Sequence, residues 1–390
     1  MSGRKVEGEG ARTLGRTGSR EPIHIEGPDG DRPFDATELE RDLRVMWKAA
    51  SSKRGTIYRA ALANLISPLS ACDSDCFTPI LTEITRRHPS RLFCVQRNDS
   101  APTGHGLRAH VNAFCHIRPG GGSLVCSEQI AIAWDDPSGP LVPSAIASLL
   151  VGDIPTVLLE LEQGPMPAWR EKLAGLADAR IADSGLAHDP AECPAIWKRR
   201  PGRSDRPLHD LAWARLAPWR EILAEAFDPT ESAGALASIQ DVTIFYRGSG
   251  PPAGAWLLAG WLASRLDWNP RELAGGQIRL GANTRPVSIR FEVEGNNARR
   301  GPSGPTHAIA GIRIRSGTPA PLDLTVRHEG RSPTARVTTR APRATEREVA
   351  FGYREFAACV VGEMHRHEPN RAFEDAARVA EELIGLWQKG

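Results

Sequence analysis

The spacing of apolar residues changes along the chain, and each spacing predicts a type of element. Apolar positions three or four residues apart begin after Asp35, which is placed to cap a helix together with Glu38. Continuous or alternating apolar runs bounded by turn residues predict strands elsewhere. Residues 1–34 have no apolar period and are rich in Gly, Arg, Glu and Pro, so we expect a disordered tail there.

Predicted strands and helices alternate between residues 35 and 198. After the helix that begins at Asp35, further helices are expected at Ser74–His88, Leu141–Leu150 and Ala168–Leu176. The predicted strands are Ile57–Ile66, Arg91–Arg97, Arg108–Ile117, Leu124–Trp134, Thr156–Leu161 and Ala179–Ala182. This alternation predicts an N-terminal α/β domain over 35–198, with a mainly parallel sheet flanked by helices.

The character of the chain changes after this region. The polar, basic stretch 199–209 is predicted to be a linker or loop, and a C-terminal domain is expected over 210–390. Its predicted elements are a strand at Val242–Tyr246, a nearly all-apolar helix at Ala255–Leu266, and a final amphipathic helix at Phe373–Trp387. Short alternating runs between Gln277 and Thr339 predict antiparallel strands with one face rich in Arg. The second domain is therefore expected to be α+β with an antiparallel sheet.

The segment Asp210–Asp228 (DLAWARLAPWREILAEAFD) combines aromatic and basic residues at helical spacing. Pro218 has no backbone N–H and would clash inside a continuous helix, so the segment is predicted to form two helical pieces. A stretch this dense in Trp is either a core element or a surface that holds a partner. The candidate partner-binding residues are Trp213, Arg215, Trp219 and Arg220. The competing interpretation places both tryptophans in the core, with the arginines as their neighbours.

Composition and charge argue against several classes of partner and location. The net charge of +2 gives no electrostatic reason to expect nucleic acid or a membrane surface as partner. No apolar run approaches the roughly 18 residues of a membrane span, and the first residues lack the apolar core of a signal peptide. The cytoplasm is the expected location. The seven cysteines are irregularly spaced, so we expect buried or incidental thiols in place of a disulfide framework.

Candidate chemical groups are scattered. Asp183–Ser184–Gly185 follows a predicted strand, where α/β folds place binding groups, but turn and capping roles are favoured, as they are for Asp153. Glu128 lies in an apolar run and must be hydrogen-bonded, paired or turned to solvent. The Gly120–Gly122 triplet is expected to be a hairpin turn, because it lacks the motifs of a phosphate-binding loop.

The histidines do not form the pairs of a metalloenzyme. Cys72 and Cys76 are spaced for one helical turn, but a second paired set of zinc ligands is missing. Near the C-terminus, His365 and His367 stand beside Glu363 and Glu368, and a solvated polar face is expected. The sequence therefore predicts no catalytic residues, no metal and no cofactor.

Several short motifs occur in an order that resembles a known family. They are HPSRLF (88–93), CSEQI (126–130), DIPTVLL (153–159), LADARIADS (176–184), the Trp-rich segment 210–228, and LLAGWLASRLDW (257–268). Together they are similar to the OpcA family, the glucose-6-phosphate dehydrogenase assembly proteins of bacteria. The resemblance spans about 35–387 and is densest over 88–268.

The resemblance implies a non-catalytic protein that binds glucose-6-phosphate dehydrogenase and promotes its active oligomer. In such proteins the effect is allosteric activation of the entry step of the oxidative pentose phosphate pathway. One departure stands out. After the Asp-Ile-Pro strand, family members usually carry a Trp-Trp-Pro-Gly type turn, where this chain has Leu158, Leu159, Glu160 and later Gly164-Pro165.

A second function class competes with this one. The protein is alternatively an enzyme or sensor that binds a sugar phosphate or nucleotide at the carboxyl ends of the parallel strands. The Arg-rich stretches Ser288–Arg290 and Ile312–Arg315 offer phosphate contacts for such a role.

Overall fold

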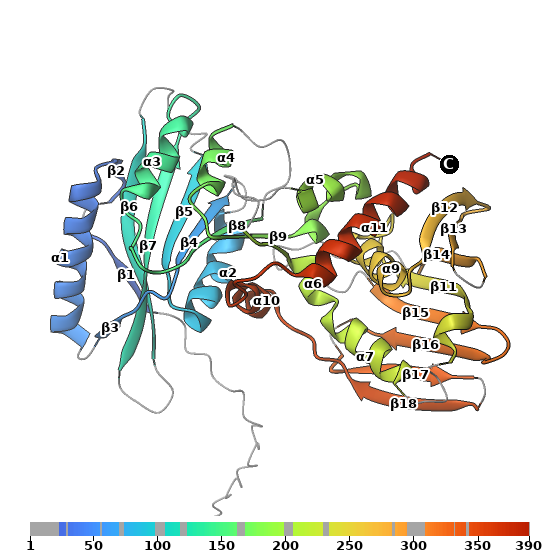
Figure 1. Ribbon diagram of the computed structural model, residues 1–390. Coiled ribbons are helices and arrows are strands. Elements are labelled where there is room, and N and C mark those ends of the chain that lie inside the picture. The colour runs from blue at the N-terminus through green and yellow to red at the C-terminus, as the bar shows by residue number, and fades with distance from the viewer. Residues whose placement is uncertain are drawn as a thin grey trace, which may run out of the picture.

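The chain forms two large sheets, each with helices packed against it (Figure 1). The computed structural model describes residues 23–28, 30–54, 57–69, 74–97, 106–117, 123–161, 168–198, 206–228, 234–282, 285–294, 309–330, 332–340 and 343–389. The first sheet uses residues from 23 to 210 and the second uses residues from 239 to 350. The predicted class is confirmed: a mostly parallel sheet with flanking helices is followed by a mostly antiparallel one.

In the described residues, the first sheet contains ten strands. They are β1 (Ile23–Glu26), β2 (Arg32–Pro33), β3 (Ile57–Arg59), β4 (Asn64–Leu69), β5 (Arg91–Arg97), β6 (Arg108–Ile117), β7 (Leu124–Trp134), β8 (Thr156–Glu160), β9 (Ala179–Ala182) and β10 (Leu208–Asp210). Their order is β1-β6-β7-β5-β4-β8-β9-β10, with β2 beside β6 and β3 beside β7. The run from β7 to β10 is parallel, and β6 joins it antiparallel through β7.

Helices cover both faces of this sheet. One face packs against α1 (Ala36–Arg54), α3 (Val142–Ala147) and α4 (Ala168–Ala174). The other packs against α2 (Ser74–Arg87) and α10 (Phe356–Met364), whose Ala357 and Val360 share a core with Leu65 of β4. Because side chains alternate across a strand, the buried strand β4 contributes to both cores: Ile66 faces the first and Leu65 the second.

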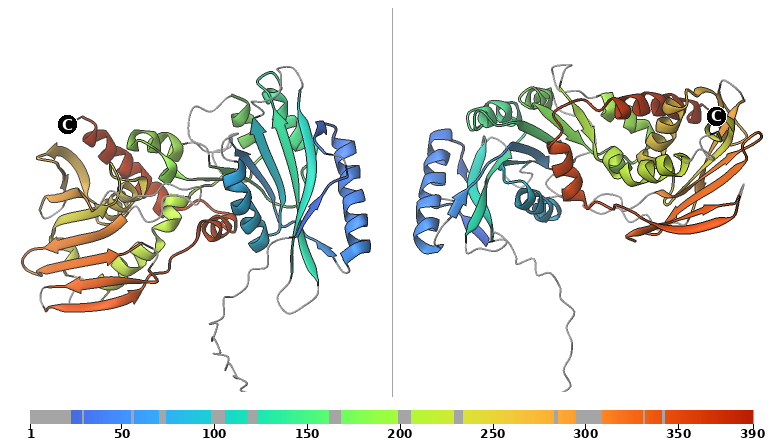
Figure 2. Two further views of the ribbon diagram at one scale, coloured as in Figure 1. Left: turned by 180° about the vertical axis from the view of Figure 1, so that it is seen from behind. Right: turned by 60° about the horizontal axis from the view of Figure 1, so that its bottom comes forward.

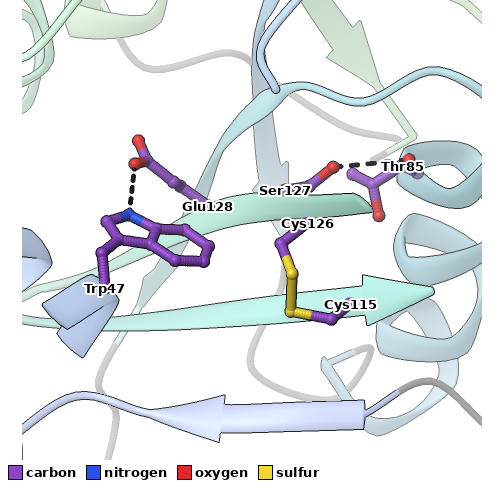
Figure 3. The surroundings of a disulfide bond; sticks show 6 residues. All are labelled: Trp47, Thr85, Cys115, Cys126, Ser127 and Glu128. Atoms are coloured by element: carbon purple, nitrogen blue, oxygen red, sulfur yellow. Dashed lines mark hydrogen bonds between the residues drawn. A yellow bond between two sulfur atoms is a disulfide. The ribbon is translucent and has the colours of Figure 1, made fainter. Parts of the chain in front are cut away.

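Glu128 is buried on the first of these faces, where three donors surround it. Its carboxylate accepts hydrogen bonds from Trp47 Nε1 (2.8 Å, Figure 3) and Arg91 Nε (2.9 Å), and it also pairs with Arg59. Of the roles open to it from the sequence, the structure therefore selects the paired carboxylate. A buried charge of this kind is tolerated only with such partners, so Glu128 joins α1 to the middle of the sheet.

The expectation that all cysteines are free thiols is wrong for one pair. Cys115 of β6 and Cys126 of β7 lie directly opposite each other in the antiparallel ladder and form a disulfide (Figure 3). The pairing follows from strand register, which sequence spacing alone does not reveal. Cys94, Cys193 and Cys359 are free and buried, Cys72 lies outside the described residues, and the side chain of Cys76 is not described.

The second sheet has eight strands in the part of the chain that the structure describes. They are β11 (Ile239–Tyr246), β12 (Asn269–Ala274), β13 (Gln277–Gly281), β14 (Val287–Val293), β15 (Ile309–Ser316), β16 (Leu322–His328), β17 (Thr334–Thr339) and β18 (Thr345–Ala350). The order is β12-β13-β14-β11-β15-β16-β17-β18, and only the β11–β14 pair of these ladders is parallel. Gly275 and Gly276, both with positive φ, form the tight turn between β12 and β13.

Three helices lie on the same side of this sheet: α7 (Ala217–Phe227), α9 (Ala253–Arg265) and α11 (Arg371–Trp387) (Figures 1 and 2). The nearly all-apolar α9 is buried between the sheet and α11, as its composition predicts. At Gly260 the backbone of α11 comes so close that a Cβ would collide with the Ala376 carbonyl oxygen and lie 2.9 Å from the Ala380 nitrogen. This glycine permits the helix contact.

Several boundaries differ from the sequence predictions. The predicted tail 1–34 contains strands β1 and β2, because Ile23 and Ile25 pack against the first core; residues 1–22 lie outside the described residues. Within the predicted linker 199–209, Leu208 begins β10, which extends the first sheet. The predicted strand 57–66 is divided into β3 and β4, which pair with different neighbours.

The hairpin predicted at Gly120–Gly122 agrees with the antiparallel pairing of β6 and β7 on either side, although the triplet itself lies outside the described residues.

Candidate functional site

The Trp-rich segment folds as two helices that meet at an elbow. Asp210 caps α6 (Leu211–Arg215) by accepting a hydrogen bond from the Trp213 backbone N–H (3.0 Å). Pro218 lies in the first turn of α7, where its missing N–H leaves no bond unmade. The predicted break is confirmed. This elbow, formed by α6 and α7, lies between the first sheet and the second sheet (Figure 1).

Both candidate tryptophans are core residues. Trp213 is 2% exposed and its ring packs near Phe373 of α11, 5.9 Å between centroids. Trp219 is 3% exposed and meets Phe351 edge-on at 5.3 Å. Neither ring presents a surface to a partner in this conformation, and their burial agrees with the competing interpretation of packing.

Arg215 is held by Asp183, the residue that follows β9. Its guanidinium makes two hydrogen bonds to Asp183, Nη1 to Oδ2 at 3.0 Å and Nη2 to Oδ1 at 2.5 Å. Burial lowers the pKa of Arg215, but the charge and hydrogen bonds of Asp183 outweigh it and raise that pKa overall. Asp183 also caps the turn that follows it, accepting from the Gly185 N–H (2.9 Å), so the predicted capping role is confirmed.

Arg220 lies over the indole of Trp213. Its guanidinium carbon is 3.5 Å from the ring centroid, the geometry of a cation–π contact. Burial, followed by the charge of nearby Arg366, lowers the pKa of Arg220 to about 10. No carboxylate of the described residues lies within ion-pair distance of this guanidinium. Trp213 is thus both a core residue and the platform that positions a cation.

Asp210 and Asp183 lie next to each other at the carboxyl ends of neighbouring parallel strands, β10 and β9. Asp210 Oδ2 accepts from the Ser184 N–H at 3.0 Å. Burial, and then the negative charge of Asp183, raise the pKa of Asp210 to about 6. At the carboxyl ends of β9 and β10, where α/β folds place binding groups, Asp183 and Asp210 therefore serve as caps, and Asp183 also pairs with Arg215.

A small pocket opens beside the elbow. One wall comes from α6 and α7, and the other from residues 351–354, which link β18 to α10. Its lining residues are Ala214, Arg215, Pro218, Phe351, Gly352, Tyr353 and Arg354. Sequence reasoning pointed to Arg215 but not to the 351–354 segment, because that stretch has no periodicity and reaches the elbow only through tertiary packing.

The C-terminal polar cluster forms the expected solvated face only in part: His365, His367 and Glu368 are exposed, but Glu363 is not. Glu363 is buried, 3.3 Å from His209 Nδ1, and it pairs with Arg366 (3.2 Å). His365 packs edge-on against His88 of the first half, 5.0 Å between ring centroids. Glu363 is buried because α10 returns to the first sheet, where this side chain becomes part of the seam between the two halves.

The Arg-rich strands already have acidic partners. Arg290 and Arg315 converge on Asp241, at 3.5 and 3.2 Å, from strands on either side of β11. Arg313 makes two hydrogen bonds to Asp323, at 2.8 and 2.5 Å. Phosphate binding by these arginines would have to compete with carboxylates that are in place.

Other chemistry is sparse in the described part of the chain. Asp153 adopts a positive φ of 64° in the turn before β8, a conformation that Asp tolerates.

Among the described residues no three His, Cys, Asp or Glu side chains gather as metal ligands. None of the helices described there is long and apolar enough to cross a membrane. The divergent Gly164-Pro165 turn lies outside the described residues.

Curated relatives resemble about half of this chain. A protein of Nostoc punctiforme named "Putative OxPP cycle protein OpcA" is 35% identical over 196 residues, which are 49% of this chain and 41% of that one. A protein of the same name from Synechocystis is 31% identical over 197 residues, 49% of this chain and 40% of that one. The matched region thus spans about two fifths of these relatives' length.

Solved structures offer only a distant likeness. A probable dehydrogenase from Thermotoga maritima aligns with 84% of this chain and 98% of its own, at 11% identity and a TM-score of 0.39. An oxidoreductase from the same organism aligns equally weakly, at 10% identity, over 84% of this chain and 97% of its own, with a TM-score of 0.39. Similarity at this level carries no argument about function.

Two family profiles cover most of the chain in consecutive order. Residues 81–200 match the domain described as the glucose-6-phosphate dehydrogenase subunit N-terminal domain. Residues 206–377 match the corresponding C-terminal domain. The junction between them falls just before β10 and the Trp-rich elbow. The chain belongs to the OpcA family of glucose-6-phosphate dehydrogenase assembly proteins.

Proposed function

We propose that this protein is a non-catalytic assembly factor that binds glucose-6-phosphate dehydrogenase and acts as its allosteric activator. In this role it promotes the active oligomer of the enzyme in the oxidative pentose phosphate pathway, in the cytoplasm. The observation that carries the proposal is the ordered match of both halves to domains described as parts of a glucose-6-phosphate dehydrogenase subunit.

The energy that such a role requires is modest. An activator needs only to bind the active state of the enzyme better than the inactive state, and a hundredfold difference corresponds to about 2.7 kcal/mol. A few well-placed anchors supply that amount in protein interfaces, where Arg and Trp dominate.

We propose the elbow as part of the contact surface, with different tasks for its residues. Arg215 and Arg220, which are partly exposed, are the partner contacts. Trp213 and Trp219, which are buried, hold the two arginine-bearing helices in place. In this division, Trp213 also carries Arg220 on its ring.

Co-elution tests the proposal directly. The purified protein is mixed with glucose-6-phosphate dehydrogenase from the same organism, and complex mass and substrate affinity are measured. We expect a complex larger than either component and a higher substrate affinity than that of the enzyme alone. Separate elution together with unchanged kinetics would refute the assembly role.

The competing role of a sugar-phosphate or nucleotide sensor has its own test. Thermal melting of the protein alone is followed while glucose 6-phosphate or NADP is titrated, since a true ligand raises the melting temperature with concentration. We expect no shift, because Arg290, Arg313 and Arg315 are engaged by carboxylates.

A further inference from the structure

The pocket beside the elbow has two arginines in different electrostatic states. Arg215 is neutralised by Asp183, to which it is bonded through both terminal nitrogens. Arg354, on the opposite wall, is exposed and makes no ion pair with any described residue. The acidic neighbour Glu355 is turned to Arg87 of α2, 3.2 Å away. The uncompensated charge at the pocket is therefore that of Arg354.

Arg215 is a preorganised hydrogen-bond donor. Its side chain is 19% exposed, and the Asp183 side chain that fixes it is fully buried. A guanidinium has five N–H groups, so the two bonds to Asp183 leave others available for a further acceptor. Because the side chain is already immobilised, a further hydrogen bond costs little rotamer entropy.

The pocket suits a small anionic group. Pro218 and Phe351 supply apolar walls, and the space between them holds about one water-sized group, the size of one carboxylate oxygen. A sugar phosphate or a nucleotide is much too large for it. A carboxylate is planar and small, and it is the group whose geometry matches a guanidinium.

We propose that this pocket receives an acidic side chain, Asp or Glu, from the surface of the partner protein. Arg354 attracts the carboxylate, Arg215 donates a hydrogen bond to it, and Pro218 and Phe351 exclude water around it. The inference rests on the proposed function, since the partner meant is the dehydrogenase. It adds which face of the molecule docks and which chemistry on the partner is recognised.

Charge reversal at Arg354 tests this inference. Arg354→Glu and Arg354→Ala are compared with the unchanged protein for affinity to the dehydrogenase by titration calorimetry at low and high salt. We expect Arg354→Glu to weaken binding by at least about tenfold and Arg354→Ala by a smaller factor. The difference should shrink at high salt, because exposed charge interactions are screened.

Arg44→Glu is the matched control, since Arg44 is an exposed arginine on α1, away from the elbow (Figure 1). It should leave the affinity within about twofold, and all three variants should melt as the unchanged protein does. Normal affinity of Arg354→Glu, in a complex that forms, would overturn this inference while the assembly role stands. Failure of the unchanged protein to bind the dehydrogenase would overturn both.

Discussion

The guanidinium of Arg215 and the carboxylate of Asp183 face each other through two hydrogen bonds, although 32 residues separate them in the chain. The pair joins the first turn of the elbow, α6, to the carboxyl end of β9 in the first sheet. Because Asp183 is fully buried, its carboxylate finds no water to replace Arg215.

Asp183→Asn should therefore be strongly destabilising. Removing one partner of a buried ion pair leaves an uncompensated charge, and we expect a loss of about 3 kcal/mol in the free energy of unfolding. Asn keeps the cap on the Gly185 N–H, so the loss reports the ion pair. Chemical denaturation measures it.

The double variant Asp183→Asn/Arg215→Met serves as the control. It removes the stranded cation as well, so its destabilisation should be smaller than the sum of the two single variants. Strict additivity would show that the two side chains are energetically independent.

Asp210 should make stability depend on pH. Its pKa is raised to about 6 from an ordinary 3.8, so the folded state holds the proton more tightly than the unfolded state does. The contribution of Asp210 to stability is full below about pH 4 and is lost as the pH rises through 6. The loss is on the order of 3 kcal/mol.

Comparison with Asp210→Asn isolates this effect, because Asn retains a capping side chain but does not titrate. The stability of the unchanged protein relative to the variant should fall between pH 4 and 6 and remain constant above that range. A difference that does not change with pH would contradict the burial of a titrating Asp210.

Trp219→Ala should lower the melting temperature. The side chain is buried against Phe351, and replacing such a residue by Ala typically costs about 3–5 kcal/mol. Trp219→Phe, which keeps much of the apolar volume, should lose considerably less. If Trp219→Ala melts normally but no longer activates the dehydrogenase, the residue is a direct contact and its burial in the core is disproved.

Gly260→Ala should destabilise the contact between α9 and α11, since the added Cβ would collide with the Ala376 carbonyl oxygen. Gly254→Ala in the same helix is the matched control. Its Cβ would meet Ile309 and Leu216 at ordinary distances of 3.6 and 3.7 Å. Thermal melting should show a marked loss for the first, and for the second a gain of up to about 1 kcal/mol from helix propensity. Equal melting temperatures would contradict the close helix contact.

The sequence pattern predicted helices and strands correctly where neighbouring residues set their limits. The runs at β5, β6 and β7 are bounded by turn residues, and their ends agree with the prediction. Pro218 separates α6 from α7 because its ring removes the backbone N–H and would clash inside a continuous helix. The two sheet types were also predicted from the sequence. Strands that alternate with helices indicate a parallel sheet, and strands with alternating polar and apolar positions indicate an antiparallel one.

Contacts between residues that are distant in the sequence could not be predicted from these patterns. The Cys115–Cys126 disulfide depends on the register of β6 against β7, and the burial of Glu363 depends on α10 returning to the first sheet. Hydrophobic periodicity reports which side of an element is buried, but not which element covers it.

The sequence by itself determined the family, the fold class and the break in the Trp-rich segment, because these rest on motif order and local backbone chemistry. Only the tertiary structure decided that its tryptophans are core, that Arg215 is held by Asp183, and that the 351–354 segment completes a pocket. The physical reason is that burial and charge pairing are set by neighbours far away in the chain, here brought together where the two sheets meet.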